Sequence, residues 1–194
     1  MAYAYDVFLS YKRGTVNSKW LVEHFLPLFK DRLGEQVADK CDRDADGIFF
    51  DEDDVKVGSK ISTRVADGIR SSRCVVALWS PRYFRSEYCN IEWLSFEKRS
   101  KEYGKDLVVP AIICQGANLP KEAQDRKWID LSTYTIIGQG FTLSERYVEF
   151  QDAIARFAKR VAEIVASAPE WSEFPVSDPP PSPPSVTPIM QVSL

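Results

Sequence analysis

The chain has 194 residues, of which 44% are hydrophobic and 27% are charged, and its net charge is -3. This length suits one well-buried core and is too short for two ordinary domains, while the charge gives no electrostatic reason to expect nucleic acid as a partner. The start shows no cationic stretch followed by an apolar one, and no run approaches the ~20 apolar residues that span a bilayer, so we expect a cytoplasmic protein without a membrane partner.

The first half of the chain alternates short runs of β-branched and aromatic residues with longer amphipathic segments. The short runs predict strands, and apolar residues at helical spacing predict helices. In chain order we expect a strand at 5–10, a helix at 16–33 that Pro27 can kink, a strand at 48–51 and a helix from Gly58 to about residue 69.

The second half continues this alternation. Residues 74–79 are apolar throughout, as expected of a central parallel strand that is covered on both faces. A helix at 86–101, strands at 107–114 and 128–131, and a final helix at 143–167 follow. Such an alternation selects a doubly wound α/β sheet, because a right-handed crossover is the usual connection between neighbouring parallel strands. We expect five strands, all or nearly all parallel.

The predicted fold indicates where a ligand would bind and where the domain ends. Doubly wound sheets bind ligands outside the carboxyl ends of their strands, which points to the segments 10–20, 51–60, 80–92 and 115–127. Beyond Pro169 the sequence Ser-Asp-Pro-Pro-Pro-Ser-Pro-Pro favours extended polyproline conformations and cannot pack a core. We therefore expect one domain at 1–168 and a disordered proline-rich tail at 169–194.

One acidic segment has the spacing of a calcium-binding loop. Asp42, Asp44 and Asp46 alternate before a glycine. Asp53 then falls where an EF-hand places its bidentate glutamate. The segment leads into a predicted strand instead of the second helix that an EF-hand requires, so we interpret it as a solvated turn and leave cation binding open.

The remaining metal-ligand candidates give no site pattern. His24 is the only histidine and lies among apolar residues of a predicted helix, where we expect it to pack in the core. The four cysteines stand far apart without paired spacing: Cys41, Cys74, Cys89 and Cys114. We therefore predict no metal, no disulfide framework and no resident cofactor.

Four segments, in this order and at these spacings, resemble the Toll/interleukin-1 receptor (TIR) domain family. They are Tyr-Asp-Val-Phe-Leu-Ser-Tyr-Lys-Arg at 5–13, Phe-Asp-Glu-Asp-Asp-Val-Lys-Val-Gly at 50–58, Val-Val-Ala-Leu-Trp-Ser-Pro at 75–81 and Ser-Glu-Tyr-Cys-Asn-Ile-Glu-Trp at 86–93. The resemblance covers about residues 3–166. It implies a flavodoxin-like three-layer sandwich with a five-stranded parallel sheet, in agreement with the periodicity.

The resemblance implies one of two functions. Some proteins similar to this one are adaptor modules that assemble with other TIR domains, and others are enzymes that break the nicotinamide–ribose bond of NAD+. Glu92 falls at the glutamate position of the enzymatic subgroup, flanked on its helix by Tyr88 and Phe96. A carboxylate there could stabilise a developing oxocarbenium ion, orient ribose hydroxyls or assist water. The alternative is that Glu92 pairs with an exposed cation such as Arg82 or Arg85.

The resemblance also implies substrate-binding residues. Tyr11 and Arg13 end the first strand, where a cation could contact a phosphate and an aromatic ring could stack on a base. The acidic loop that begins at Asp51 resembles a mobile loop that covers the nucleotide site and contacts a neighbouring domain. The implied binding residues are Tyr11, Arg13, Asp51, Gly58, Trp79, Ser80 and Tyr88.

We therefore expect an NAD+ nucleosidase, with Glu92 as the catalytic residue, that is activated by self-association with other TIR domains in immune or stress signalling. NAD+ is its expected substrate. The sequence leaves the product open between ADP-ribose and a cyclic isomer, and it gives neither the activating signal nor the geometry of assembly. The alternative function is a non-catalytic scaffold that binds other TIR domains.

Overall fold

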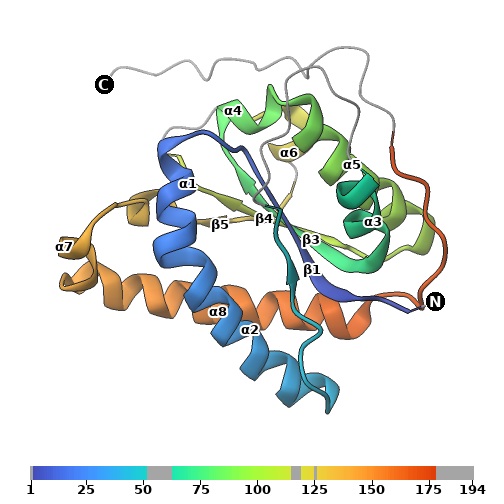
Figure 1. Ribbon diagram of the computed structural model, residues 1–194, viewed down its shortest axis with the longest axis horizontal. Helices are drawn as coiled ribbons and strands as arrows, with labels where there is room; N and C mark the ends of the chain where they lie inside the picture. The colour runs from blue at the N-terminus through green and yellow to red at the C-terminus, as the bar shows by residue number, and fades with distance from the viewer. Residues whose placement is uncertain (1, 52–62, 115–118, 125, 178–194) are drawn as a thin grey trace.

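A single parallel sheet forms the centre of the protein. The computed structural model describes residues 2–51, 63–114, 119–124 and 126–177 (Figure 1). Its sheet has five strands in the order β2-β1-β3-β4-β5, and every neighbouring pair is parallel. This strand order is that of flavodoxin-like folds, and it confirms the predicted five-stranded parallel sheet. The strands are β1 (Tyr5–Tyr11), β2 (Ile48–Phe49), β3 (Ser72–Trp79), β4 (Val108–Ile112) and β5 (Ile129–Asp130).

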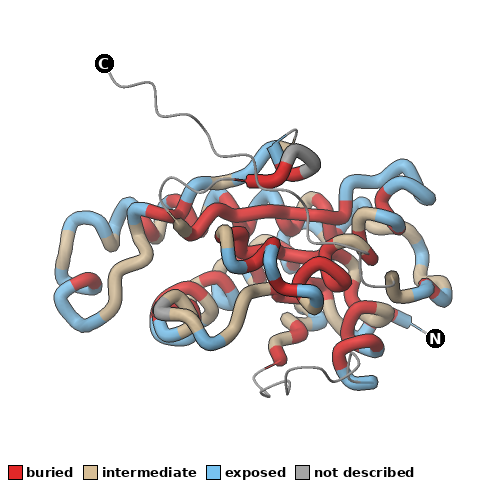
Figure 2. The backbone as a smooth tube through the Cα atoms, turned by 90° about the horizontal axis from the view of Figure 1, so that it is seen from above, coloured by how far each residue is buried: buried red, intermediate tan, exposed pale blue. Residues whose placement is uncertain are grey.

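The two longest strands, β1 and β3, lie side by side in the middle of the sheet. Six register pairs join them, from Tyr5 opposite Ser72 to Tyr11 opposite Leu78. Every residue of β3 except Arg73 is buried. Figure 2 shows this buried centre surrounded by exposed loops and helix faces. Helices cover both faces of the sheet, which explains why the apolar run of β3 has no polar alternation.

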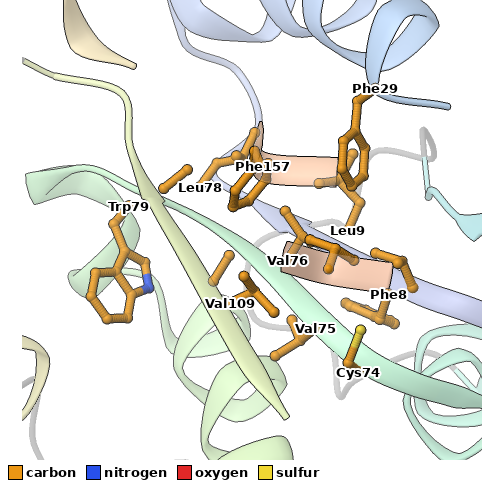
Figure 3. Close-up of a cluster of buried hydrophobic side chains, with 14 of the residues drawn as sticks. Phe8, Leu9, Phe29, Cys74, Val75, Val76, Leu78, Trp79, Val109 and Phe157 are labelled. Carbon is orange, nitrogen blue, oxygen red and sulfur yellow. The ribbon is translucent and has the colours of Figure 1, made fainter. Parts of the chain in front are cut away.

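One face of the sheet is covered by helices from the two ends of the domain. They are α1 (Val16–Trp20), the π-helical turn η1 (Leu21–Phe25), α2 (Leu26–Cys41) and α8 (Glu145–Ser167). Phe29 of α2 and Phe157 of α8 pack together, with ring centroids 5.5 Å apart, near Leu9 and Leu78 (Figure 3). Together the three helical segments of the first part extend the predicted helix 16–33 to Cys41.

Pro27 does not end the helical segment in which it lies. Proline has no backbone N–H and removes one helical hydrogen bond. The π-helical turn Leu21–Phe25 comes directly before Leu26 and Pro27, and α2 continues beyond them. Such π-helical segments occur mostly as single turns inside α-helices. The proline therefore coincides with a change in helix type instead of an end.

The opposite face carries α3 (Thr63–Ser71), α4 (Pro81–Phe84) and α5 (Glu87–Tyr103). Serines begin both later helices: Ser80 Oγ accepts from the Tyr83 N–H at 3.2 Å, and Ser86 Oγ accepts from the Cys89 N–H at 3.5 Å. In α3, a Cβ on Gly68 would lie 2.7 Å from the Phe49 ring, so a glycine lets β2 pack closely against this helix.

Several short elements were not predicted. They are α6 (Lys121–Gln124), the 3-10 turn η2 (Ser132–Tyr134) and α7 (Gln139–Thr142), together with α4. One helical turn is too short to show a periodic pattern, which is why sequence reasoning treats such segments as loops. The predicted start of the helix at Gly58 lies outside the described residues. Among the helices that are described, none has the length and apolar character needed to cross a membrane.

The domain extends further than the predicted boundary at residue 168. Phe174 is only 4% exposed and its ring centroid lies 5.4 Å from that of Tyr103. The same ring lies over the Arg99 guanidinium at 4.1 Å, and the Ser177 N–H donates to Ser95 Oγ at 2.9 Å. Residues 169–177 therefore pack along α5, and the Phe174 ring supplies the buried apolar contact. Residues 178–194 lie outside the described part.

Candidate active site

Glu92 lies in the second turn of α5, at the face of the helix that packs on β1. Its side chain is buried, with 7% of the residue exposed. Ser10 Oγ of β1 donates to Glu92 Oε2 at 2.5 Å, and the hydroxyl oxygen of Tyr83 in α4 lies 2.7 Å from Ser10 Oγ. Three elements therefore meet at this carboxylate. Within the described residues Glu92 has no ion pair, and Arg82 and Arg85 are not its partners.

Burial raises the pKa of the Glu92 carboxyl from 4.5 to about 7. The hydrogen bond from Ser10 and the positive charges of Arg13 and Lys12 lower this pKa, and the negative charge of Asp51 raises it. A buried carboxylate without a neutralising partner is unfavourable in its charged form. Its pKa therefore lies close to physiological pH, which is typical of functional sites.

The carboxyl end of β1 and the residues that follow β2 meet beside Glu92. Arg13 Nη2 donates to Asp51 Oδ2 at 2.7 Å, and the Tyr11 hydroxyl donates to the Asp51 carbonyl at 3.4 Å. The Tyr11 ring stacks on Phe50 with centroids 5.3 Å apart. The structure thus brings three of the predicted binding residues, Tyr11, Arg13 and Asp51, into one cluster.

Charge and burial act in opposite directions on Arg13. Burial alone would lower the pKa of its guanidinium, but the hydrogen bond and negative charge of Asp51 raise it above its ordinary value. Asp51 is 5% exposed and also lies 3.8 Å from an Arg64 nitrogen. An anionic ligand that approached Arg13 would therefore compete with Asp51 for the same donors.

A second contact fixes α5 to the same end of β1. Cys89 Sγ lies 3.6 Å from the Tyr11 carbonyl oxygen, to which it donates. Burial raises the pKa of the Cys89 thiol well above its ordinary value, so the group is a neutral donor at physiological pH. Glu92, one helical turn further along, is thereby placed at the carboxyl end of β1.

The remaining predicted binding residues have other surroundings. The Trp79 ring is fully buried and packs against Phe84 and Trp93, with centroids 5.3 and 6.1 Å away. Ser80 uses its hydroxyl to cap α4. Tyr88 is half-buried in the first turn of α5, and Gly58 lies outside the described residues. Ligand contacts by these residues stay predictions, and for Trp79 such a contact would require the core to open.

Ser10 and Tyr83 are the site residues that sequence reasoning missed. Ser10 had a usable signal, because it is a polar residue at the end of the otherwise apolar run Val-Phe-Leu-Ser. Tyr83 had none, because it lies in a single helical turn within a segment that reads as a loop. Its contact with Ser10 joins positions 73 residues apart.

The possible calcium loop has charge partners within the protein. Asp46 Oδ2 lies 3.2 Å from Arg43 Nη1 and 3.0 Å from Arg73 Nη2. In the described part of the chain, no three or more His, Cys, Asp or Glu side chains are arranged to hold a metal ion. Asp53 lies outside the described residues. His24 is buried and its ring lies 5.2 Å from that of Phe141 in an edge-on contact, which confirms its predicted packing role.

Two hollows are lined by described residues in other parts of the molecule. The larger, about 870 Å³, lies between the end of α5, the strands β4 and β5, and α8. The smaller, about 580 Å³, lies between β2 and α3. Glu92 lines neither of them.

Comparison with known proteins identifies the family. The family profile of the TIR domain matches residues 7–140. A curated protein of Methanobrevibacter olleyae, the probable 2' cyclic ADP-D-ribose synthase TcpO, is 27% identical over 89 residues, which are 46% of this chain and 22% of that protein. The chain thus aligns with under a quarter of that relative's length.

Two solved structures are similar to parts of the chain. One is the TIR domain of the Toll-related receptor TRR-2 from Hydra magnipapillata, with TM-score 0.43, 15% identity, and coverage of 77% of this chain and 98% of that one. The other contains the TIR domains of the activated Roq1 resistosome that recognises the pathogen effector XopQ, with TM-score 0.36, 21% identity, and 83% coverage of each chain. Because the family profile matches more than half of its residues, the chain belongs to the TIR domain family.

Proposed function

We propose that this TIR domain is an NAD+ nucleosidase, a hydrolase or cyclase, in which Glu92 acts on the ribose beside the nicotinamide. The observation that carries the proposal is the buried Glu92 carboxylate with its raised pKa and no ion pair within the described residues. Tyr11, Arg13 and Asp51 lie at the same carboxyl end of the sheet, the edge at which doubly wound folds bind their ligands.

One carboxylate is sufficient for this reaction. The nicotinamide ring of NAD+ is cationic, so the bonding electron pair moves to its nitrogen and the ring leaves as a neutral molecule without a general acid. Positive charge then develops on the ribose, where the ionised Glu92 carboxylate can stabilise it. Water adds to the anomeric carbon and loses a proton to give ADP-ribose, or a hydroxyl of the same molecule adds and loses its proton to give a cyclic isomer.

The polar cluster beside Glu92 offers groups for the rest of the substrate. The Arg13 guanidinium suits the pyrophosphate and the Tyr11 ring suits stacking on a planar base. Substrate binding would exchange the Arg13–Asp51 ion pair for an Arg13–phosphate contact. The TcpO relative supports this class of chemistry, because its name describes synthesis of a cyclic ADP-D-ribose.

The proposal includes activation by self-association. The acidic segment 51–54 lies in sequence next to the polar cluster, so a neighbouring copy that contacts this segment would also act on the site. Release of nicotinamide per molecule is then expected to rise with protein concentration. Immune or stress signalling is the proposed setting.

The test is nicotinamide release from NAD+ by the purified chain over a range of protein concentrations. Products are separated by chromatography and identified by mass spectrometry, which distinguishes ADP-ribose from a cyclic isomer. Glu92→Gln is expected to lose the activity. Glu102→Gln is the matched control, because Glu102 is exposed near the end of the same helix. Association without nicotinamide release by the wild type at any concentration would instead indicate a scaffold and overturn the proposal.

A further inference from the structure

Two buried hydroxyl groups stand behind the Glu92 carboxylate. Ser10 and Tyr83 are both 0% exposed, and they come from β1 and α4. Their oxygens lie 2.7 Å apart, and Ser10 Oγ lies 2.5 Å from Glu92 Oε2. Among the described residues, the three groups form a chain of two hydrogen bonds that runs from Tyr83 through Ser10 to the carboxylate.

The number of available protons determines which group donates in each of these two hydrogen bonds. An ionised carboxylate only accepts hydrogen bonds, so the single hydroxyl proton of Ser10 is donated to Glu92. Ser10 Oγ is then the acceptor for Tyr83, whose hydroxyl must donate. Burial raises the pKa of Tyr83 well above 10, so its proton is retained for this purpose at physiological pH. Each donor polarises the next group in the chain.

The two oxygens of the carboxylate have different surroundings. Oε2 is held by Ser10, whereas Oε1 has no hydrogen bond within the described residues. A glutamate side chain rotates about three bonds, and a fixed partner for one oxygen also fixes the position of the other. The chain of hydroxyl groups therefore determines where the second oxygen is presented.

We propose that Ser10 and Tyr83 are positioning residues that hold Glu92 Oε2, so that Oε1 faces the ribose of the substrate. This inference rests on the proposed function, in which Glu92 acts on that ribose. Neither hydroxyl touches the substrate in this arrangement. Ser10 acts directly on Glu92, and Tyr83 acts through Ser10.

The other charged and titratable groups near Glu92 do not replace this contact. Lys12 and Arg13, which follow β1, and Asp51, which follows β2, act through their charges, and Cys89 of α5 donates to a backbone carbonyl. Removal of the Ser10 hydroxyl therefore leaves Oε2 without a hydrogen-bond donor among the described groups.

The variants Ser10→Ala and Tyr83→Phe separate positioning from packing. Ser10→Ala is expected to lower kcat about 10- to 100-fold with little change in KM, because it removes a hydrogen bond to a charged group. Loss of this donor also raises the pKa of Glu92 and moves the acid limb of the kcat profile to higher pH. Tyr83→Phe preserves the buried ring and is expected to give the same changes at several-fold smaller size.

Ser72→Ala is the matched control. Ser72 is a buried serine on the neighbouring strand β3, and its hydroxyl donates to the Gly68 carbonyl at 2.7 Å. The Ser72→Ala substitution removes a buried hydroxyl group that does not contact Glu92. If Ser10→Ala and Tyr83→Phe match Ser72→Ala in kcat and in the acid limb, the proposal is overturned. Circular dichroism and thermal unfolding confirm that the compared variants are folded.

A carbon-13 NMR titration of the Glu92 carboxyl group tests the same contact without turnover. In Ser10→Ala this titration is expected to move to higher pH by about one unit, and in Ser72→Ala it is expected to stay unchanged. Absence of turnover in the wild type would refute the proposed function. An unchanged Glu92 titration in Ser10→Ala would refute the positioning role, so the two failures are distinguishable.

Discussion

Two buried carboxylates, Asp6 and Glu92, lie near opposite ends of β1 and have very different partners. Asp6 is 0% exposed and accepts from Arg43 Nη2 at 2.5 Å, from Arg73 Nε at 3.0 Å and from the Asp46 N–H at 2.7 Å. Glu92 has a single hydroxyl donor, Ser10, and no ion pair within the described chain. Guanidinium groups thus balance the charge of one of these two buried carboxylates, Asp6 of β1, and not that of the other, Glu92 of α5.

The difference teaches that two carboxylates with similar burial can differ in whether positive groups compensate their charge. Two guanidinium groups and a backbone N–H compensate the charge of Asp6, so this group ties β1 to its neighbours. Glu92 lacks such compensation, and burial raises its pKa to about 7. When such an uncompensated carboxylate is ionised, its electrostatic field acts strongly on a ligand, and its burial lowers the stability of the folded protein.

The largest expected effect is on activity at Glu92. Glu92→Gln preserves the shape of the side chain and removes its charge, so nicotinamide release is expected to fall on the order of 1000-fold. The measurement is product formation by mass spectrometry at high protein concentration, beside Glu102→Gln. A Glu92→Gln variant that retains more than a tenth of the wild-type rate would contradict the catalytic role.

Asp6→Asn is expected to show the reverse pattern. It removes the buried carboxylate charge and leaves Arg43 and Arg73 only the Asp46 carboxylate as a shared partner, so the free energy of unfolding should fall by about 3 kcal/mol. Urea denaturation followed by tryptophan fluorescence measures this change, with the exposed Asp152→Asn as control. Activity per folded molecule is expected to stay within twofold of the wild type. A loss of activity at unchanged stability would show that Asp6 supports activity instead of folding, contrary to this prediction.

The pH dependence of stability is expected to separate Glu92 from its neutral replacement. Because burial raises the Glu92 pKa from 4.5 to about 7, the folded protein holds this proton more tightly than the unfolded chain between these values. Raising the pH through this interval should therefore lower the stability of the wild type relative to Glu92→Gln, by up to about 3 kcal/mol.

Unfolding by urea at several pH values measures this relative loss. Activity is expected to increase with pH over the upper part of the same interval, because the ionised carboxylate is the active form. A stability difference between wild type and Glu92→Gln that is constant from pH 4.5 to 8 would show that Glu92 titrates normally.

The smallest expected effect comes from Arg13, one of the cations whose charge acts on Glu92. Arg13→Gln removes the partner of Asp51 and the proposed phosphate contact, so the KM for NAD+ should rise about tenfold while kcat changes less. Lys30→Gln, an exposed cation of α2, is the control. Since the charge of Arg13 lowers the Glu92 pKa, the acid limb should also move to higher pH. Equal KM values for the two variants would show that Arg13 does not contribute to NAD+ binding.

Much of the fold was predictable because periodicity reports burial. The apolar run at 74–79 indicated the central strand β3, and the alternation of strands and helices indicated a doubly wound sheet. Short elements escaped this signal, as did the packing of Phe174 on Arg99, since one aromatic residue beside a proline-rich stretch has no period. The position of Glu92 among apolar neighbours was also visible, because residues three and four apart share a helix face.

The sequence by itself determined the five strands and the longer helices, the family to which the chain belongs, and the candidate glutamate. Only the tertiary structure decided which polar groups meet: Ser10 with Glu92 across 82 positions, Tyr83 with Ser10 across 73, and Arg13 with Asp51 across 38. The physical reason is that hydrophobic spacing reports which side of an element faces inward. The partner of a buried polar atom depends on strand register and helix packing, which bring together residues that no local pattern connects.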